Sequence, residues 1–253
     1  MSEPTQRFSG RVADYERYRE RYDPAILLPR LRQWCAFTSN WCVADIGAGT
    51  GMLTDVFLSN GNPVVAVEPN TEMLRSLQTL HADNPKLRIM EATAEATTLH
   101  DHSVDLISVG RAFHLFHTQS AMSEFRRVLR PGGWVVIVAY GRSEKGREEN
   151  RALETLLSKF SADSTTGTRS RYSAYSNLEQ YFPWAYHHEE IPGEMRLSWS
   201  ELRGMTLSLS HTPLESDPRF PDFERTLHSL FHHYAEGGIL TLTTRYWINV
   251  GQF

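Results

Sequence analysis

Three glycines at alternate positions, Gly47, Gly49 and Gly51, form the segment of this sequence best suited to bind a ligand through its backbone. An apolar run ending in Asp45 precedes them, and helix-forming sequence follows. Glycines at this spacing let a ligand approach the main chain without contacting Cβ atoms, and the first turn of the following helix leaves its N–H groups available as donors. The carboxylate of Asp45 suits a ligand that carries a cation, such as the ammonium group of an amino-acid tail. The pattern therefore predicts a nucleoside-cofactor site.

A second acidic residue, Glu68, follows the next apolar run and lies nineteen residues beyond Gly49. This separation is close to the roughly 20 residues between a glycine loop and an acid that accepts hydrogen bonds from ribose hydroxyls. A lone acid after a strand is usually a surface residue, but its coincidence with the glycine loop favours ribose binding.

The elements that must position these residues alternate regularly along the chain. Apolar runs predict strands at 41–45, 63–67, 87–90, 104–109 and 134–139, and helical periodicity predicts helices at 23–37, 50–59, 70–80 and 118–129. This alternation predicts βαβ units, and hence an α/β fold with a doubly wound, mainly parallel sheet. Ligands of such sheets bind at the carboxyl ends of the strands.

After Tyr140 the pattern loosens. A helix at about 148–160 lies in a charged and Ser/Thr-rich stretch, and a strand near 188–197, a helix near 222–234 and a strand at 239–250 follow. We therefore expect one domain, residues 1–253, in four parts. These are N-terminal helices that close over the cofactor (1–37), a cofactor-binding core (38–140), a lid insertion (141–185) and a segment that completes the sheet (186–253).

Composition excludes several classes of protein. The net charge of −4 and the pI near 6.3 provide no overall field that attracts nucleic acid or anionic lipid. The longest apolar run, 134–140, is too short to span a bilayer, and the first residues contain no signal-like apolar stretch. Two cysteines, Cys35 and Cys42, are spaced neither for metal nor for redox chemistry. These features predict a cytoplasmic protein without nucleic-acid or membrane partners, either a monomer or a homodimer.

Four segments carry a resemblance to a known family. VADIGAGTG (43–51), VEPN (67–70), ATAEATTLHDHSVDLISVGRAFHLF (92–116) and EFRRVLRPGGWVVIVAY (124–140) resemble, in order and spacing, the class I S-adenosylmethionine-dependent methyltransferases. More narrowly, the chain resembles their small-molecule branch, which includes trans-aconitate methyltransferase-like enzymes. The segment FSGRVADYERYRERYD (8–23) resembles the part that closes over the cofactor in this branch. The resemblance implies a seven-stranded sheet whose last strand is antiparallel, S-adenosylmethionine as the cofactor and a small-molecule methyl acceptor.

The resemblance also implies roles for individual residues. The methionine part of the cofactor would lie against Asp45 and the backbone of Gly47, Ala48, Gly49 and Gly51, with Gly110 and Arg111 beneath the sulfonium. Glu68 would bind the ribose, and Pro69 and Met73 would pack near the adenine. Relatives often have Asp where this chain has Thr93, so Ala94 and Glu95 are also candidates for contact with the adenine amino group. Tyr15, Tyr18 and Arg19 match the closing segment, with Arg19 a candidate partner for the cofactor carboxylate.

His114 is the candidate general base, since it follows the fourth strand at the predicted catalytic mouth. A base is needed only if the acceptor atom carries a proton at the working pH, and packing against the cofactor is the alternative role for this histidine. The pairs His187–His188 and His232–His233 predict no metal site, because neighbouring side chains on a strand point to opposite faces. Arg142, Arg169 and Arg171 are candidates for binding a carboxylated acceptor.

Two other functions fit parts of the sequence. An NAD-dependent oxidoreductase would need glycine at position 52, which is Met52, and an apolar residue in place of Asp45. A cofactor-binding protein that acts through partners without catalysis is consistent with every motif.

Overall fold

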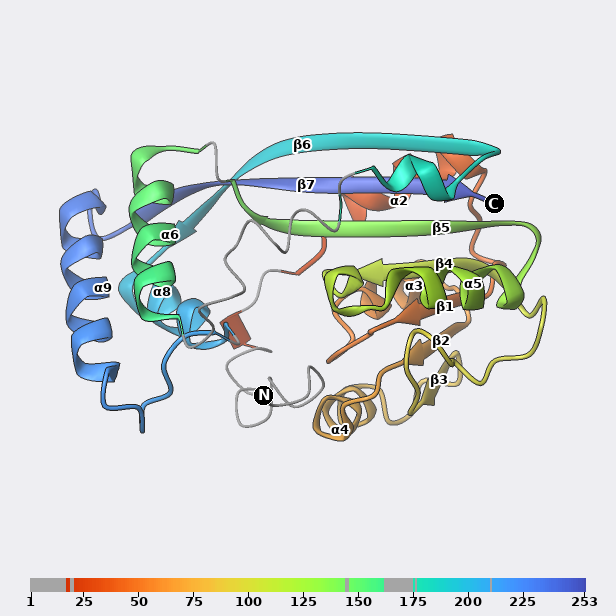
Figure 1. The fold of residues 1–253 in the computed structure, drawn as a ribbon, viewed down its shortest axis with the longest axis horizontal. Coiled ribbons are helices and arrows are strands. Elements are labelled where there is room, and N and C mark those ends of the chain that lie inside the picture. Colours follow the sequence, from red (N-terminus) through yellow and green to blue (C-terminus); the bar gives the residue numbers. More distant parts are fainter. Residues whose placement is uncertain (1–16, 19–20, 144–145, 162–174, 176, 210) are drawn as a thin grey trace.

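A seven-stranded sheet with the strand order β3-β2-β1-β4-β5-β7-β6 organises the protein (Figure 1). The computed structural model describes residues 17–18, 21–143, 146–161, 175, 177–209 and 211–253. All neighbouring strands pair in parallel except β7, which runs antiparallel to both β5 and β6. The prediction of a mainly parallel sheet with an antiparallel last strand is therefore confirmed. The strands are β1 (Val43–Ile46), β2 (Val64–Val67), β3 (Leu87–Met90), β4 (Val104–Gly110), β5 (Leu129–Arg142), β6 (Ala185–Leu197) and β7 (Leu240–Gln252).

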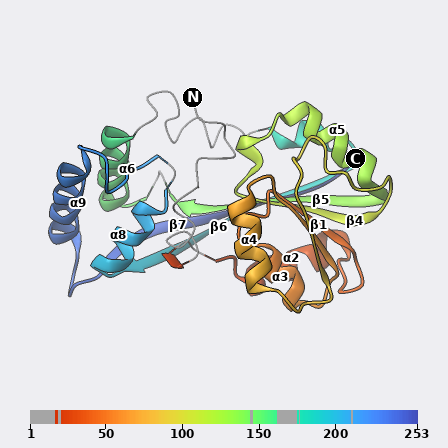
Figure 2. The same ribbon diagram turned by 90° about the horizontal axis from the view of Figure 1, so that it is seen from below.

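Helices cover both faces of the central strands (Figure 2). On one face, α2 (Pro24–Cys35) and α3 (Thr54–Ser59) pack on β-strand residues such as Val136 and Val138. On the other face, α5 (Thr118–Val128) packs on their neighbours Val135 and Ile137. Since successive strand residues point to opposite faces, strands covered on both sides must be apolar throughout, as they are here. Helix α4 (Thr71–Leu80) and the 3₁₀ helices η2 (Phe113–Leu115) and η3 (Leu178–Tyr181) complete this part.

Two helix starts show how local sequence sets the boundaries. The Asn70 side chain accepts hydrogen bonds from the N–H groups of Glu72 and Met73 and so caps α4, as predicted. By contrast, the helix predicted from Thr50 begins at Thr54, because Gly51 has a φ of 93° and cannot continue a helical turn.

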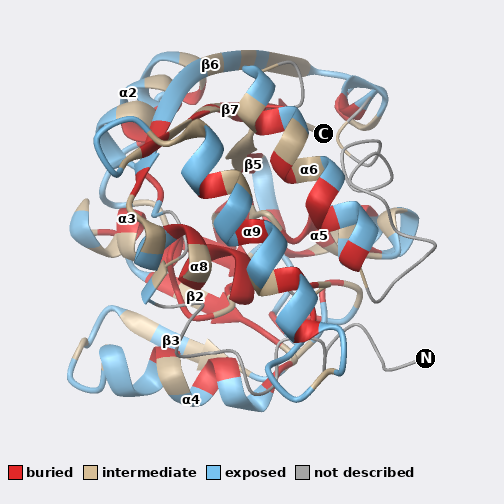
Figure 3. Cartoon of the chain, turned by 90° about the vertical axis from the view of Figure 1, so that its left-hand side faces the viewer, coloured by how far each residue is buried: buried red, intermediate tan, exposed pale blue. Residues whose placement is uncertain are grey.

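A second group of helices lies beyond one end of the sheet. It consists of α6 (Glu148–Phe160), α8 (Trp199–Leu207) and α9 (Phe220–Tyr234), and we call it the helical cap. The cap packs on the outer halves of β6 and β7, through residues such as Met195 and Leu242. Figure 3 shows that α9 carries both buried and exposed residues along its length, and its buried residues Phe223, Leu227 and Phe231 belong to the core of the cap. Because β5 leads toward α6, the cap lies at the end to which the carboxyl ends of the parallel strands point (Figure 1).

The cap is built from different segments of the chain than the predicted lid. Sequence analysis placed the lid at 141–185 and assigned 186–253 to the sheet, whereas α6 packs with α8 and α9 from the later segment. Helix α8 was not predicted, because its buried side chains do not form one stripe. A signal for it was present, since Ser198 and Glu201 form a capping box. Residues 162–174 and 176 of the predicted lid lie outside the described residues.

No helix in the described part of the chain is long and apolar enough to cross a membrane.

Candidate cofactor site

The glycine loop leads from β1 to α3 and is hydrogen-bonded to the carboxyl end of β2. The N–H groups of Gly47 and Ala48 both donate to the carbonyl oxygen of Val67, at 2.8 and 3.1 Å. Gly47, Gly49 and Gly51 have φ values of 70°, 59° and 93°, which favour glycine. A Cβ on Gly47 would lie 2.6 Å from Cβ of Ala112, and one on Gly51 would lie 2.3 Å from a methyl carbon of Leu77. At Gly47 and Gly51, close internal packing therefore favours glycine in addition to the positive φ.

Glu68 closes the loop from the side of β2. One carboxylate oxygen accepts from the N–H of Gly49 at 3.0 Å, and the other accepts from the N–H of Asn70 at 2.9 Å. Burial raises the pKa of this carboxyl, and the two backbone hydrogen bonds oppose that rise. An ionised carboxylate has about four acceptor positions, so each oxygen retains capacity for a ribose hydroxyl.

Asp45 lies beneath the loop and is completely buried. Its two oxygens accept hydrogen bonds from Thr54 Oγ1 at 2.6 Å and from Ser108 Oγ at 2.8 Å. Burial raises the pKa of Asp45 to about 6, and these hydroxyl donors oppose the rise. The two hydroxyls therefore fix the Asp45 side chain between α3 and β4.

A cavity adjoins the loop and brings six of the predicted cofactor residues together, namely Asp45, Gly47, Ala48, Gly49, Gly110 and Arg111. Its lining includes Arg111, from the turn after β4. The lining residues are Tyr22, Asp45, Gly47, Ala48, Gly49, Thr50, Met52, Leu53, Gly110 and Arg111. Sequence analysis missed Tyr22, although it lies in the N-terminal segment from which Tyr18 and Arg19 were chosen.

The other predicted cofactor residues that the structure describes do not line the cavity. A Cβ built on Gly49 would be 3.6 Å from the Met73 sulfur, so Met73 lies beside the loop. Pro69 is half-buried between Glu68 and the helix-capping Asn70. Thr93 is exposed and Ala94 belongs to the apolar core under α5. The Glu95 side chain accepts a hydrogen bond from the N–H of His117 and so caps the start of α5.

The structure places Tyr18 away from this cavity. A Cβ on Gly204 of α8 would lie 2.3 Å from the Tyr18 ring, so the ring packs on the cap. Arg19, like Tyr15, Arg169 and Arg171, lies outside the described residues. The proposed closing role of this segment therefore stays a prediction.

His114 lies on η2 and is half-buried. Its Nδ1 atom is 3.4 Å from the hydroxyl oxygen of Tyr175, and it does not belong to the lining of the cavity. The other candidate polar residue, Arg142, donates through Nε to Glu154 of α6 at 2.6 Å. His114 therefore has a potential proton-sharing neighbour, whereas Arg142 is engaged by a carboxylate of the cap.

The two histidine pairs lie in different surroundings: His187 and His188 are on β6, whereas His232 and His233 are in the last turn of α9, where the ring of His232 contacts that of His228. His187 stacks on Trp34 and Trp134, while His188 contacts the Asn249 side chain. No group of three or more potential metal-ligating side chains occurs among these residues.

The donor set fits an adenosine derivative with an amino-acid tail. Glu68 offers acceptors for a ribose, the glycine loop allows close approach, and Asp45 and Arg111 place opposite charges around the same cavity. A zwitterionic tail needs both charges.

Comparisons with known proteins agree with this geometry. Residues 44–137 match the model of a family described as methyltransferase domain. An uncharacterized methyltransferase of Mycobacterium tuberculosis is 38% identical over 138 residues, which cover 54% of either chain. A solved protein of Anaeromyxobacter dehalogenans has the same fold, with a TM-score of 0.61, 22% identity and coverage of 93% of this chain and 98% of its own.

A second solved structure contains a ligand of the expected kind. The phosphoethanolamine N-methyltransferase 2 of Haemonchus contortus was solved with S-adenosylhomocysteine, and it has a TM-score of 0.54 at 15% identity over 96% of this chain and 57% of its own. At this identity the likeness shows the fold. The chain spans about half the length of the mycobacterial relative, 54%.

Proposed function

We propose that this protein is a class I S-adenosylmethionine-dependent methyltransferase that transfers a methyl group to a small organic acceptor, since residues 44–137 match a family described as methyltransferase domain. The observation that carries the proposal is the arrangement of Glu68, the glycine loop and Arg111 around one end of the sheet. The carboxyl ends of β1 and β4 meet there, where the strand order reverses and ligands of such sheets bind.

The bound cofactor supplies an electrophilic methyl group on a sulfonium, which a nucleophile displaces in line. The protein mainly has to align the two reactants and exclude water, since the sulfur loses its charge without assistance. Glu68 would fix the ribose, and the glycine loop and Arg111 would fix the tail. His114 would accept a proton from an acceptor that carries one.

The acceptor is proposed to be a small molecule with a carboxylate or hydroxyl group. The resemblance to the trans-aconitate methyltransferase-like branch suggests this class, and the position of the cap supports a small acceptor. Helices α6, α8 and α9 lie on the side of the sheet end where the methyl group would be presented. Residues of the cap are therefore the expected determinants of acceptor choice.

Calorimetric titration with S-adenosylmethionine, S-adenosylhomocysteine and NAD tests the cofactor directly. We expect micromolar binding of the two sulfur compounds and none of NAD. Binding of NAD alone would contradict the proposal. Cofactor binding without turnover on any pool of small metabolites would indicate a cofactor-binding protein without catalysis.

A further inference from the structure

Arg111 has an unusual backbone conformation at the edge of the cofactor cavity. Its φ is 55°, in the left-handed region that residues with a Cβ rarely adopt. The turn is fixed because the Arg111 N–H donates to the carbonyl oxygen of Val138 at 2.9 Å. Such conformations persist where the surrounding structure enforces them, and they concentrate at functional sites.

The Arg111 side chain reaches back over the glycine loop. Its Nη2 atom lies 3.2 Å from the sulfur of Met52, the residue after Gly51. The guanidinium carbon lies 5.1 Å from the ring centroid of Tyr22, within the range of a cation–π contact. The cation therefore lies beside the cavity, against an aromatic ring.

Tyr22 is itself held firmly from β7. The Tyr246 hydroxyl accepts from the N–H of Asp23 at 3.1 Å and donates to the carbonyl oxygen of Arg21 at 3.4 Å, so it fixes the residues on both sides of Tyr22. Gly110 allows the approach, because a Cβ there would lie 2.9 Å from the Tyr22 hydroxyl oxygen. The ring that supports Arg111 is thus positioned before any ligand arrives.

The charges around the cavity match a zwitterion. Asp45, in β1, and Arg111, just after β4, both line the cavity, and Glu68, just after β2, accepts a hydrogen bond from Gly49 of the loop. We propose that Arg111, supported by Tyr22, binds the carboxylate of the cofactor's amino-acid tail, so that the site selects nucleosides that carry this carboxylate. Guanidinium groups suit the role because they donate two parallel hydrogen bonds to a carboxylate. The inference rests on the proposed function.

Calorimetry with three ligands isolates the carboxylate. S-adenosylhomocysteine carries the full tail, its decarboxylated analogue keeps the ammonium group, and 5′-methylthioadenosine lacks both. We expect Arg111→Gln to weaken binding of S-adenosylhomocysteine at least about tenfold and to change the other two affinities by less than about twofold. Tyr22→Leu should act in the same direction but more weakly, since Tyr22 positions the guanidinium. Arg111→Lys, which keeps the charge but not the paired donors, should lie between wild type and Arg111→Gln.

The matched control is Arg126→Gln. Arg126 also lies over an aromatic ring, with its guanidinium carbon 4.5 Å from the centroid of Phe253, but it belongs to α5 and is exposed. The Arg126→Gln variant should bind all three ligands with unchanged affinity. Equal losses for all three ligands in Arg111→Gln and Arg111→Lys, or no loss for any, would overturn the assignment and leave the proposed function standing. Failure of the wild type to bind S-adenosylhomocysteine would overturn both.

Discussion

At the scale of single residues, Glu68 provides the sharpest test of the cofactor site. We expect Glu68→Ala to weaken S-adenosylmethionine binding by at least about tenfold, because the ribose loses charged acceptors in a site that excludes water. The loop also loses the hydrogen bond to Gly49. Calorimetric titration measures the change. Glu91→Ala, which removes an exposed acid just after β3, is the control, and equal affinities in the two variants would refute ribose binding.

Substitution of His114 distinguishes a role in proton transfer from a role in packing. If it accepts a proton from the acceptor, His114→Ala should lower turnover far more than cofactor affinity. The His114 Nδ1 atom lies close to the Tyr175 hydroxyl. Removal of this hydroxyl in Tyr175→Phe should therefore change the surroundings of the imidazole and alter the pH profile of turnover. Steady-state kinetics, together with cofactor titration, separates the two roles. Equal losses of turnover and affinity in His114→Ala would identify a packing residue.

The raised pKa of the buried Asp45 predicts a pH dependence of the free energy of unfolding. Burial raises its pKa from 3.8 to about 6, so the native state binds more protons than the unfolded state between these values. The free energy of unfolding therefore falls as the pH rises through this window. At 1.36 kcal/mol for each unit of pKa shift, the raised pKa of Asp45 corresponds to a change of about 3 kcal/mol in the free energy of unfolding.

Asp45→Asn should remove this contribution. Denaturant unfolding of the cofactor-free protein at pH 4 and pH 7 measures the effect. Between these pH values the variant should lose about 2 kcal/mol less free energy of unfolding than the wild type, because pH 4 already lies above the unfolded pKa of 3.8. Ser108→Ala is the complementary change, since loss of its hydroxyl donor should raise the pKa of Asp45 further and enlarge the wild-type effect. Identical pH dependence in Asp45→Asn and the wild type would contradict the argument.

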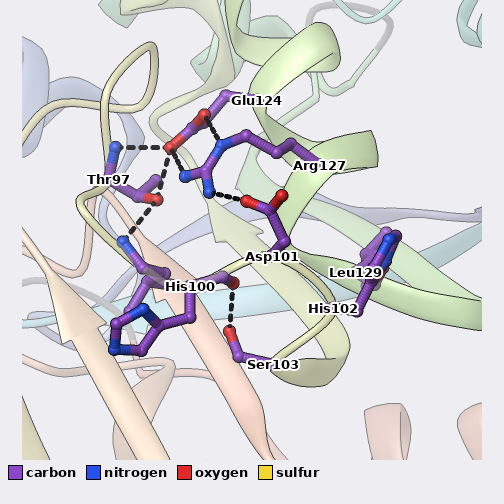
Figure 4. Close-up of polar contacts among 9 residues, drawn as sticks. Thr97, His100, Asp101, His102, Ser103, Glu124, Arg127 and Leu129 are labelled. Atoms are coloured by element: carbon purple, nitrogen blue, oxygen red, sulfur yellow. Dashed lines mark hydrogen bonds and ion pairs between the residues drawn. The ribbon is translucent and has the colours of Figure 1, made fainter.

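At the scale of elements, α5 holds the loop between β3 and β4. Figure 4 shows Glu124 of α5 accepting hydrogen bonds from the backbone and hydroxyl of Thr97 and from Arg127, while Arg127 also pairs with Asp101. The loop contains two non-glycine residues with positive φ, Thr98 and His102. These conformations cost free energy, which the contacts to α5 offset.

Glu124→Gln should therefore destabilise the protein by about 1–3 kcal/mol, the usual size of hydrogen bonds to a charged group. The Arg127 guanidinium holds the pKa of Glu124 at about 2, below the ordinary 4.5. The stabilisation is complete above pH 4.5 and is lost as the pH falls toward 2. Thermal unfolding at pH 7 and pH 3 measures the effect, with Glu91→Gln as the exposed control. A variant as stable as the wild type at pH 7 would show that Thr97 and Arg127 find other partners.

At the scale of the whole molecule, a largely buried ion pair connects the sheet to the cap. Arg142 at the end of β5 donates to Glu154 of α6, and both side chains are largely buried, at 11% and 19% exposure. Removing one partner leaves a buried charge, which typically costs 3–5 kcal/mol. We expect Glu154→Gln to loosen the cap and to increase its rate of proteolysis, while affinity for S-adenosylhomocysteine changes by less than about twofold, because the cavity lies in the other part. Glu194→Gln, in an exposed pair with Arg147, is the control. Loss of cofactor affinity in Glu154→Gln would show that cap and cofactor site are coupled.

The sequence by itself determined the alternation of strands and helices, the glycine loop and Glu68. These features depend on local signals, namely apolar runs, the Asn70 cap and the spacing of glycines, so residues near one another in the chain suffice to reveal them. Only the tertiary structure placed Tyr22 rather than Tyr18 at the cavity, because Tyr246, more than two hundred residues away in sequence, fixes that segment. It also decided that α8 and α9 join α6 in the cap. These helices associate because they bury apolar side chains against the outer halves of β6 and β7. The buried residues of α8 have no helical periodicity from which this contact could be predicted.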